Sequence, residues 1–238
     1  MKQYDLAILG GGPGGYVAAI RAAQLGLTTA IIDQDKLGGI CLNWGCIPTK
    51  ALLKNAEVLD TVKNAKNFGI NIPSYKVDFA KTIRRSRQIS ERLSKGIDFL
   101  MKKNNITHII GRGSFIAENK IEVKNGRKQV AVQAKHFIIA TGGRPKVYPG
   151  MDFDDNQVIS SKEAMILNQP PEEMVIVGAG AIGAEFAYFY NSYGTKVTLL
   201  EMMDRVLPME DEEVSQGIRG EFYKNWYSST HQYNGRKD

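Results

Sequence analysis

Residues 4–15 read Tyr-Asp-Leu-Ala-Ile-Leu-Gly-Gly-Gly-Pro-Gly-Gly, a short apolar run that leads directly into a glycine-rich turn. An alanine-rich stretch with helical spacing follows, and a second apolar run then ends on Asp33. Strand, turn, helix and strand in this order predict one half of a dinucleotide-binding domain. Gly10 would permit the tight turn, Gly12 would let the backbone approach a diphosphate, and Gly15 would let the helix pack on the strand.

The same plan recurs in residues 173–201, where a second glycine turn joins an apolar run to a helical one. The three glycines of this second turn are Gly178, Gly180 and Gly183. Asp33 stands 23 positions after Gly10, and Glu201 stands 23 positions after Gly178. Each acid can accept hydrogen bonds from a ribose diol, and each helix N-terminus can hold a diphosphate. Two blocks in one chain therefore predict two bound dinucleotides.

The segment between the blocks predicts helices first and strands afterwards. Residues 51–103 have a mostly helical pattern, with a break near 69–74. Within it, residues 81–103 predict an amphipathic helix with a basic, solvated outer face, because apolar residues recur at helical spacing. These apolar residues are Ile83, Ile89, Leu93, Ile97 and Leu100. Alternating patterns then predict short strands at Thr107–Ile110, Ser114–Ala117, Lys120–Val123, Val130–Val132 and His136–Ala140. Asn125-Gly126 predicts a hairpin turn.

Composition places limits on the function. Hydrophobic residues make up 43% of the 238, and no apolar run reaches the ~20 residues of a membrane span. The formal charge of +6 is modest, and no nucleic-acid motif accompanies the basic helix. The first residues lead straight into a strand and lack the pattern of a signal peptide. We therefore expect a cytoplasmic protein that binds neither nucleic acid nor membrane.

Cys41 and Cys46 are the two cysteines of the chain, with four residues between them. A structural metal site needs about four ligands, and the three histidines are scattered without ligand spacing, so no metal is expected. Two buried inert thiols are one alternative. A redox pair is favoured because the cysteines follow the first glycine block and precede a helix expected from about Pro48, where amide dipoles favour an anion. Dithiols and nicotinamide both exchange two electrons, so FAD, NAD and a disulfide could act in series.

The cysteine segment also carries a resemblance. Residues 38–53 read Gly-Gly-Ile-Cys-Leu-Asn-Trp-Gly-Cys-Ile-Pro-Thr-Lys-Ala-Leu-Leu. They resemble the active-site segment of class I pyridine nucleotide-disulfide oxidoreductases and are most similar to its dihydrolipoamide dehydrogenase branch. Residues 140–145, Ala-Thr-Gly-Gly-Arg-Pro, are similar to the family's second FAD-contact motif. The resemblance extends from about residue 3 to about residue 225.

This resemblance implies roles for individual residues. Cys41 would exchange with the substrate, Cys46 would face the flavin, and Lys50 would pair with Glu185 near the flavin. The implied cofactor contacts are Gly10, Gly12, Gly15, Asp33, Gly39, Lys50, Thr141 and Gly142 for FAD, and Gly178, Gly180, Gly183 and Glu201 for NAD. An acid at position 201 would repel the 2′-phosphate of NADP, so NAD is expected, although Arg205 follows closely in the sequence.

The implied fold is α/β with two Rossmann-like units, an FAD domain with a β-meander insertion and then an incomplete NAD domain. We expect the FAD domain over residues 1–145, a connection over 146–172 and the partial NAD domain over 173–225. Residues 226–238 are polar where the family continues with a strand, and we interpret them as an aberrant, frameshifted tail. The dimerisation domain of the family, with its acid–base histidine, is not in this sequence.

The implied reaction is the oxidation of protein-bound dihydrolipoamide to lipoamide, with NAD as acceptor. The partners would be a lipoyl domain of a 2-oxoacid dehydrogenase or glycine cleavage complex, and a second copy of the full-length chain. Another flavin disulfide reductase or a mercuric reductase is an alternative within the family. A non-catalytic FAD-binding fragment is an alternative from another class.

Overall fold

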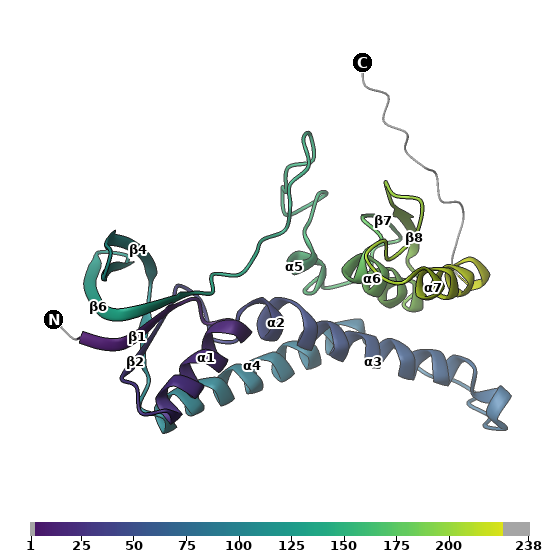
Figure 1. Ribbon diagram of the computed structural model, residues 1–238. Helices are drawn as coiled ribbons and strands as arrows, with labels where there is room; N and C mark the ends of the chain where they lie inside the picture. Colours follow the sequence, from purple (N-terminus) through teal and green to yellow (C-terminus); the bar gives the residue numbers. More distant parts are fainter. Residues whose placement is uncertain (1–2, 226–238) are drawn as a thin grey trace, which may run out of the picture. The chain divides into compact units, whose positions relative to one another are not determined.

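The structure is a computed structural model that describes residues 3–225 (Figure 1). It divides into two compact units. The first combines the chain up to Pro48 with Ser86–Lys162, and the second combines Thr49–Arg85 with the chain from Glu163 onward. The tail expected over residues 226–238 lies outside the described residues. No helix in residues 3–225 is long and apolar enough to cross a membrane.

The first unit contains a six-stranded sheet with the strand order β3-β2-β1-β6-β5-β4. The strands are β1 (Gln3–Leu9), β2 (Thr29–Asp33), β3 (Thr107–Ile110), β4 (Arg112–Ala117), β5 (Lys120–Asn125) and β6 (Lys128–Ile139). Strands β3, β2, β1 and β6 run parallel, whereas β4, β5 and β6 pair antiparallel as a meander. The hairpin predicted at Asn125-Gly126 joins β5 to β6. The sheet thus confirms the α/β class and the meander insertion.

Strand β6 differs from the prediction, because the two short strands expected at Val130–Val132 and His136–Ala140 are one continuous strand. Its first half pairs with β5 and its second half with β1, and Gln133 has a partner on both sides. The polar residues between the two apolar runs suggested a break. These polar residues remain in the strand because β6 pairs with β5 up to Gln133 and with β1 from Gln133 onward, so it has a hydrogen-bonded neighbour on both sides of the expected break.

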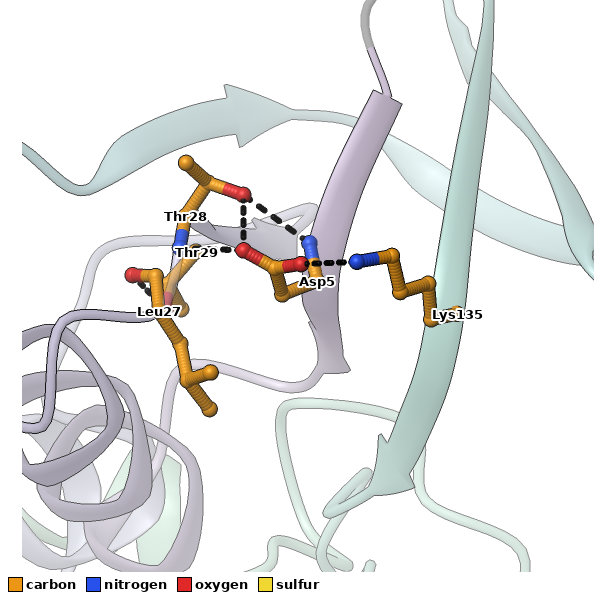
Figure 2. Close-up of polar contacts among 5 residues, drawn as sticks. All are labelled: Asp5, Leu27, Thr28, Thr29 and Lys135. Carbon is orange, nitrogen blue, oxygen red and sulfur yellow. Dashed lines mark hydrogen bonds and ion pairs between the residues drawn. The ribbon is translucent and has the colours of Figure 1, made fainter.

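Asp5 of β1 fastens three segments of this sheet together (Figure 2). Its carboxylate accepts hydrogen bonds from the Thr28 amide at 2.9 Å, the Thr28 hydroxyl at 2.6 Å and the Lys135 ammonium at 2.7 Å. Lys135 lies in β6, and Thr28 directly precedes β2. These donors, Lys135 first among them, hold the pKa of the Asp5 carboxyl well below its usual range, because each of them favours the ionised form.

Both faces of β1 and β2 are buried, as expected for parallel strands covered on two sides. One face packs on α1 (Pro13–Gln24) through Ala19 and on the end of α4 (Phe79–Lys103) through Met101. The other face packs on the meander through Ile121 and Val132. This two-sided burial explains why both runs read as continuous apolar stretches in the sequence.

Helix α4 buries small hydroxyl side chains in addition to most of the predicted apolar stripe. Its most buried positions include hydroxyl side chains at a spacing of four, namely Thr82, Ser86, Ser90 and Ser94. Ile83 is buried as expected, but Leu93 is 38% exposed. Small hydroxyl side chains fit against neighbouring main chain and hydrogen-bond to it, as Ser94 does to the Leu37 carbonyl. The apolar pattern alone could not indicate this.

The second unit contains a two-stranded parallel sheet of β7 (Glu173–Val177) and β8 (Lys196–Leu200), which packs with α6 (Ala181–Ser192). The other helices of the chain are α2 (Gly39–Trp44), α3 (Cys46–Lys63), the short 3₁₀ helix η1 (Ala65–Phe68), α5 (Ser161–Ala164) and α7 (Glu212–Asn225). Phe79 of α4 packs its ring against Phe189 and Tyr193 at 5.7 and 5.0 Å between centroids. The Lys63 ammonium donates to the Ser192 carbonyl at 2.6 Å, so α6 is held by apolar and polar contacts together.

Candidate functional site

The first turn needs glycine at two positions, because the backbone packs too closely there for a side chain. Gly10 has φ +110°, and its amide donates to the Ile32 carbonyl at 2.8 Å. A Cβ at Gly10 would lie 2.0 Å from the Ala140 carbonyl oxygen, and one at Gly15 would lie 1.8 Å from the Gly10 carbonyl oxygen. Side chains at these two positions would therefore separate the turn from β6 and helix α1 from β1.

Gly12 has a different surrounding and leaves space for a ligand. It precedes α1 with an extended backbone, and no side chain caps the helix. A Cβ added at Gly12 would meet only the Gly39 Cα, at 3.8 Å. The Asp33 carboxylate accepts hydrogen bonds from the Gly11 amide and, at 2.8 Å, from the Asp35 amide. An uncapped helix start, open space and a carboxylate beside it fit the diphosphate and ribose of a dinucleotide.

The second glycine turn repeats this geometry within its own unit. The Gly178 amide donates to the Leu200 carbonyl at 2.8 Å, and a Cβ at Gly183 would lie 1.9 Å from the Gly178 carbonyl oxygen. Gly180 precedes α6 with an extended backbone, no side chain caps this helix, and a Cβ there would meet nothing within 4 Å. The Glu201 carboxylate accepts from the Ala179 amide at 2.7 Å and the Met203 amide at 2.9 Å. The uncapped helix start, the open space at Gly180 and the neighbouring carboxylate again fit the diphosphate and ribose of a dinucleotide.

The cysteine segment packs directly on the first glycine turn. Gly39 has φ +56°, and a Cβ there would lie 2.5 Å from the Gly12 Cα. The Gly38 amide donates to the Gly11 carbonyl at 2.8 Å. Helix α2 begins at Gly39 and carries Cys41, which is partly buried, and α3 begins at the exposed Cys46. Both cysteines are thiols in this structure, on consecutive helices beside the first glycine turn.

The structure also places two further pairs of predicted site residues, Lys50 with Glu185 and Thr141 with Gly142. Lys50 lies one turn after Cys46 in α3, and its ammonium forms an ion pair with the Glu185 carboxylate of α6. Thr141 and Gly142 follow β6 and are exposed, and Gly142 has φ +72° with no atom within 4 Å of an added Cβ. The residue before them, Ala140, donates its amide to the Leu9 carbonyl at 2.7 Å, which holds the start of this segment at the first glycine turn.

The sequence profile of the pyridine nucleotide-disulphide oxidoreductase family matches residues 4–226. The chain belongs to this family. Dihydrolipoyl dehydrogenase from Chlorobaculum parvum is 43% identical over 226 residues, which are 93% of this chain and 48% of that protein. Dihydrolipoyl dehydrogenase from Corynebacterium glutamicum is 47% identical over 225 residues, which are 94% of this chain and 48% of that protein. The chain thus spans about half the length of these relatives.

A solved structure has the same fold. It is the Cu(II) complex of the HOCl-induced flavoprotein disulfide reductase RclA from Escherichia coli, with a TM-score of 0.81 and 28% sequence identity. The match covers 95% of this chain and 48% of that one. It supports the same assignment of the fold as the sheet order and the two glycine turns.

Four residues that sequence reasoning did not select form the contact between the cysteine helix α2 and helix α4. They are Asn43 and Trp44 of α2, and Arg87 and Ser94 of α4. Asn43 and Ser94 are buried and hydrogen-bonded to each other, with 2.9 Å between the Asn43 Oδ1 and the Ser94 Oγ. Arg87 donates to the Asn43 carbonyl, and its guanidinium lies 4.4 Å from the centre of the Trp44 ring. Burial lowers the pKa of the Arg87 guanidinium from its ordinary value. The available signal was the spacing of four between the hydroxyl residues of α4.

Proposed function

We propose that this chain carries the flavin and disulfide part of a dihydrolipoyl dehydrogenase-type enzyme. In the full-length form, such an enzyme oxidises protein-bound dihydrolipoamide to lipoamide with NAD as acceptor. One observation carries the proposal: Gly39 packs against Gly12 so closely that the segment with Cys41 and Cys46 lies on the first glycine turn. The names of the two relatives support the choice of substrate.

The residues around the first turn would hold FAD. The uncapped start of α1 and the space at Gly12 would receive the diphosphate, and Asp33 would bind the ribose, with Thr141 and Gly142 contacting the cofactor from the segment after β6. When bound, FAD would supply two-electron transfer between the dithiol and NAD. We assign FAD binding to residues 1–145, a connection to 146–172 and part of the NAD site to 173–225.

The cysteines would exchange with the substrate in two steps. A dihydrolipoamide thiolate would attack Cys41 Sγ, forming a mixed disulfide and breaking the bond to Cys46, which leaves as a thiolate. The second substrate thiolate would then displace Cys41, so lipoamide forms and both cysteines end as thiols. The substrate loses two electrons and two protons in this exchange, and the protein disulfide gains them.

Lys50 and Glu185 would act beside the flavin. Their ion pair is largely exposed on the lysine side, where 62% of the side chain is accessible, and 26% of the Glu185 side chain is accessible. An exposed pair of this kind contributes little to stability. Its proposed role is therefore to fix a positive charge one helical turn from Cys46.

The charge around the second turn favours NAD. Glu201 is the acid beside the proposed ribose site, and its carboxylate would repel a 2′-phosphate. Arg205 could have supplied a compensating charge, but its guanidinium donates to the Pro208 carbonyl at 3.2 Å and the Glu210 carbonyl at 3.4 Å. These bonds hold Arg205 to its own loop. The proposed partners are the lipoyl domain of a 2-oxoacid dehydrogenase or glycine cleavage complex, and a second full-length copy.

The test uses the 238-residue chain purified with added FAD. The protein should remain yellow after gel filtration, and anaerobic dihydrolipoamide should bleach the flavin absorbance in the wild type but not in the Cys41→Ser variant. A folded chain that retains no FAD would contradict the proposal. Bleaching by glutathione with no response to dihydrolipoamide would indicate a different disulfide reductase of the family.

A further inference from the structure

Helix α2 carries Cys41 but is only six residues long. A helix of this length is not stable by itself in water, because too few hydrogen bonds form to offset nucleation. Its position must therefore come from surrounding contacts. In the first unit these contacts include two residues of α4, one acting at each end of α2.

At the start of α2, Ser94 and Asn43 form a buried polar cluster. The Ser94 Oγ lies 2.9 Å from both the Leu37 carbonyl oxygen and the Asn43 Oδ1. The Asn43 Nδ2 donates to the Leu37 carbonyl at 3.2 Å and to the Gly39 carbonyl at 3.1 Å. Ser94 is 4% exposed and Asn43 7%, so these bonds are shielded from water. The cluster ties α2 to the strand-to-helix loop that precedes it.

At the end of α2, Arg87 bonds to the main chain and covers the last side chain. Its Nη2 donates to the Asn43 carbonyl, and the guanidinium lies over the Trp44 ring, which Lys162 also covers with its Nζ 4.8 Å from the ring centre. The other terminal nitrogen of Arg87 is buried without a hydrogen-bond partner among residues 3–225. An unpartnered buried N–H is unfavourable for folding. The contacts of Arg87 are therefore better explained by a role in positioning α2 than by a contribution to the stability of the fold.

We propose that Ser94 and Arg87 are positioning residues for the redox pair: α4 holds α2 at both ends and thereby keeps Cys41 in reach of Cys46. The proposal rests on the proposed function, in which these two cysteines form a disulfide. A disulfide requires a narrow range of sulfur positions. Releasing α2 spreads Cys41 over many positions and lowers the effective concentration of one thiol at the other.

The equilibrium with glutathione measures this effect directly. Oxidation converts the two thiols and one glutathione disulfide into the Cys41–Cys46 disulfide and two glutathione thiols. The S–S bond of glutathione breaks, the protein S–S bond forms, and the two protons end on the glutathione thiols. The 238-residue chain is equilibrated at several glutathione ratios, and the remaining protein thiols are alkylated and counted by mass.

Two variants of α4 form a matched pair. Ser94→Ala removes the bonds to Leu37 and Asn43, whereas Ser90→Ala makes the same change at a serine of the same helix that is also buried but has no hydrogen-bond partner among the described residues. We expect the equilibrium constant for disulfide formation to fall about tenfold in Ser94→Ala, as for one or two lost hydrogen bonds. It should stay within about twofold of wild type in Ser90→Ala.

Arg87 provides a second, independent variant. Arg87→Gln should lower the same constant, and Arg87→Lys should restore only part of it, because ammonium lacks the planar fork that reaches both Asn43 and Trp44. Circular dichroism identifies variants that still fold. An unchanged constant in Ser94→Ala and Arg87→Gln, an increase in either, or an equal fall in Ser90→Ala would overturn the positioning role. If wild type forms no internal disulfide at any ratio, the proposed function itself fails.

Discussion

The Glu201 carboxylate accepts a hydrogen bond of 2.7 Å from the backbone amide of Ala179, which ties the end of β8 to the glycine turn after β7. In the first unit Asp33 makes the same bond to the Gly11 amide. Each acid also accepts from the amide two positions further on. The repeat found in the sequence is therefore a repeat of hydrogen bonding, and in both units it leaves a helix start without a side-chain cap.

The charge of Glu201 should set the choice of nicotinamide cofactor. Glu201→Gln keeps an oxygen that can accept from Ala179 but removes the charge that would repel a 2′-phosphate. We expect the preference for NADH over NADPH, measured as the ratio of their dissociation constants, to fall about tenfold or more. Glu213→Gln removes an exposed acid from α7 and should leave the ratio unchanged. Equal ratios in wild type and Glu201→Gln would remove Glu201 from the site.

Substitutions at two glycines of the first turn should change different quantities, one the affinity for FAD and the other the free energy of unfolding. Gly12→Ala places a methyl group in space that the protein leaves open, so the free energy of unfolding should hardly change while FAD affinity falls about tenfold or more. Gly15→Ala drives its methyl into the Gly10 carbonyl and should lower the free energy of unfolding by at least about 2 kcal/mol.

Gly180→Ala is the control for both changes, because it makes the same substitution in the second glycine turn, where nothing lies within 4 Å of the added Cβ and φ is −70°. Denaturant unfolding without FAD and flavin fluorescence titration measure the two quantities. If Gly12→Ala binds FAD as tightly as wild type, the diphosphate does not lie over this turn.

Lys50 should affect electron transfer much more than stability. Lys50→Met breaks the ion pair with Glu185, but the pair is exposed on the lysine side and should contribute less than about 1 kcal/mol to folding. We expect the rate of flavin bleaching by dihydrolipoamide to fall about tenfold or more, as for removal of a charge that stabilises an anion. Lys54→Met removes another exposed ion pair of α3, with Glu57, and should bleach at the wild-type rate. Similar rates in both variants would exclude a role for Lys50.

Asp5 should make the stability of the chain sensitive to acid. The pKa of its carboxyl is lowered in the folded state, so its contribution is present above the ordinary aspartate pKa of about 3.9 and is lost as the pH falls toward the folded value. Asp5→Asn should therefore lower the melting temperature by a few degrees at neutral pH, and this difference should shrink steadily below about pH 4.

The matched variant is Asp152→Asn, which changes an exposed acid of the connecting segment and should melt with the wild type at every pH. Melting curves between neutral pH and pH 3 make the comparison. A gap between Asp5→Asn and wild type that stays constant over this range would show that the carboxylate is not the source of the stabilisation.

Local patterns predicted most of the fold. The glycine turns, the helices after them and the terminal acids each lie within about thirty residues, and their chemistry depends on neighbours in the sequence. Strand β6 was predicted as two strands because its pairing changes from β5 to β1 at Gln133, and only the sheet itself reveals that both halves have partners.

The sequence predicted less of the site where the contacting residues lie far apart along the chain. Ser94 lies 51 positions from Asn43, and a serine in a basic amphipathic helix reads as solvated. Lys50 and Glu185 lie 135 positions apart, and only the resemblance to the family suggested that they meet. The spacing of four between the hydroxyl residues of α4 marks a buried face but does not identify the residues that this face contacts. The contacts that hold α2 therefore became visible only in the structure.

The most direct test of the central claim follows electrons from NADH to the cysteines. The chain is oxidised, loaded with FAD, treated with NADH without oxygen, and then alkylated. We predict two new labels, on Cys41 and Cys46, because NADH and one proton reduce the disulfide to two thiols, and we predict none when FAD is omitted. Dithiothreitol should give the same two labels without either cofactor. Labels with dithiothreitol but none with FAD and NADH together would contradict the account.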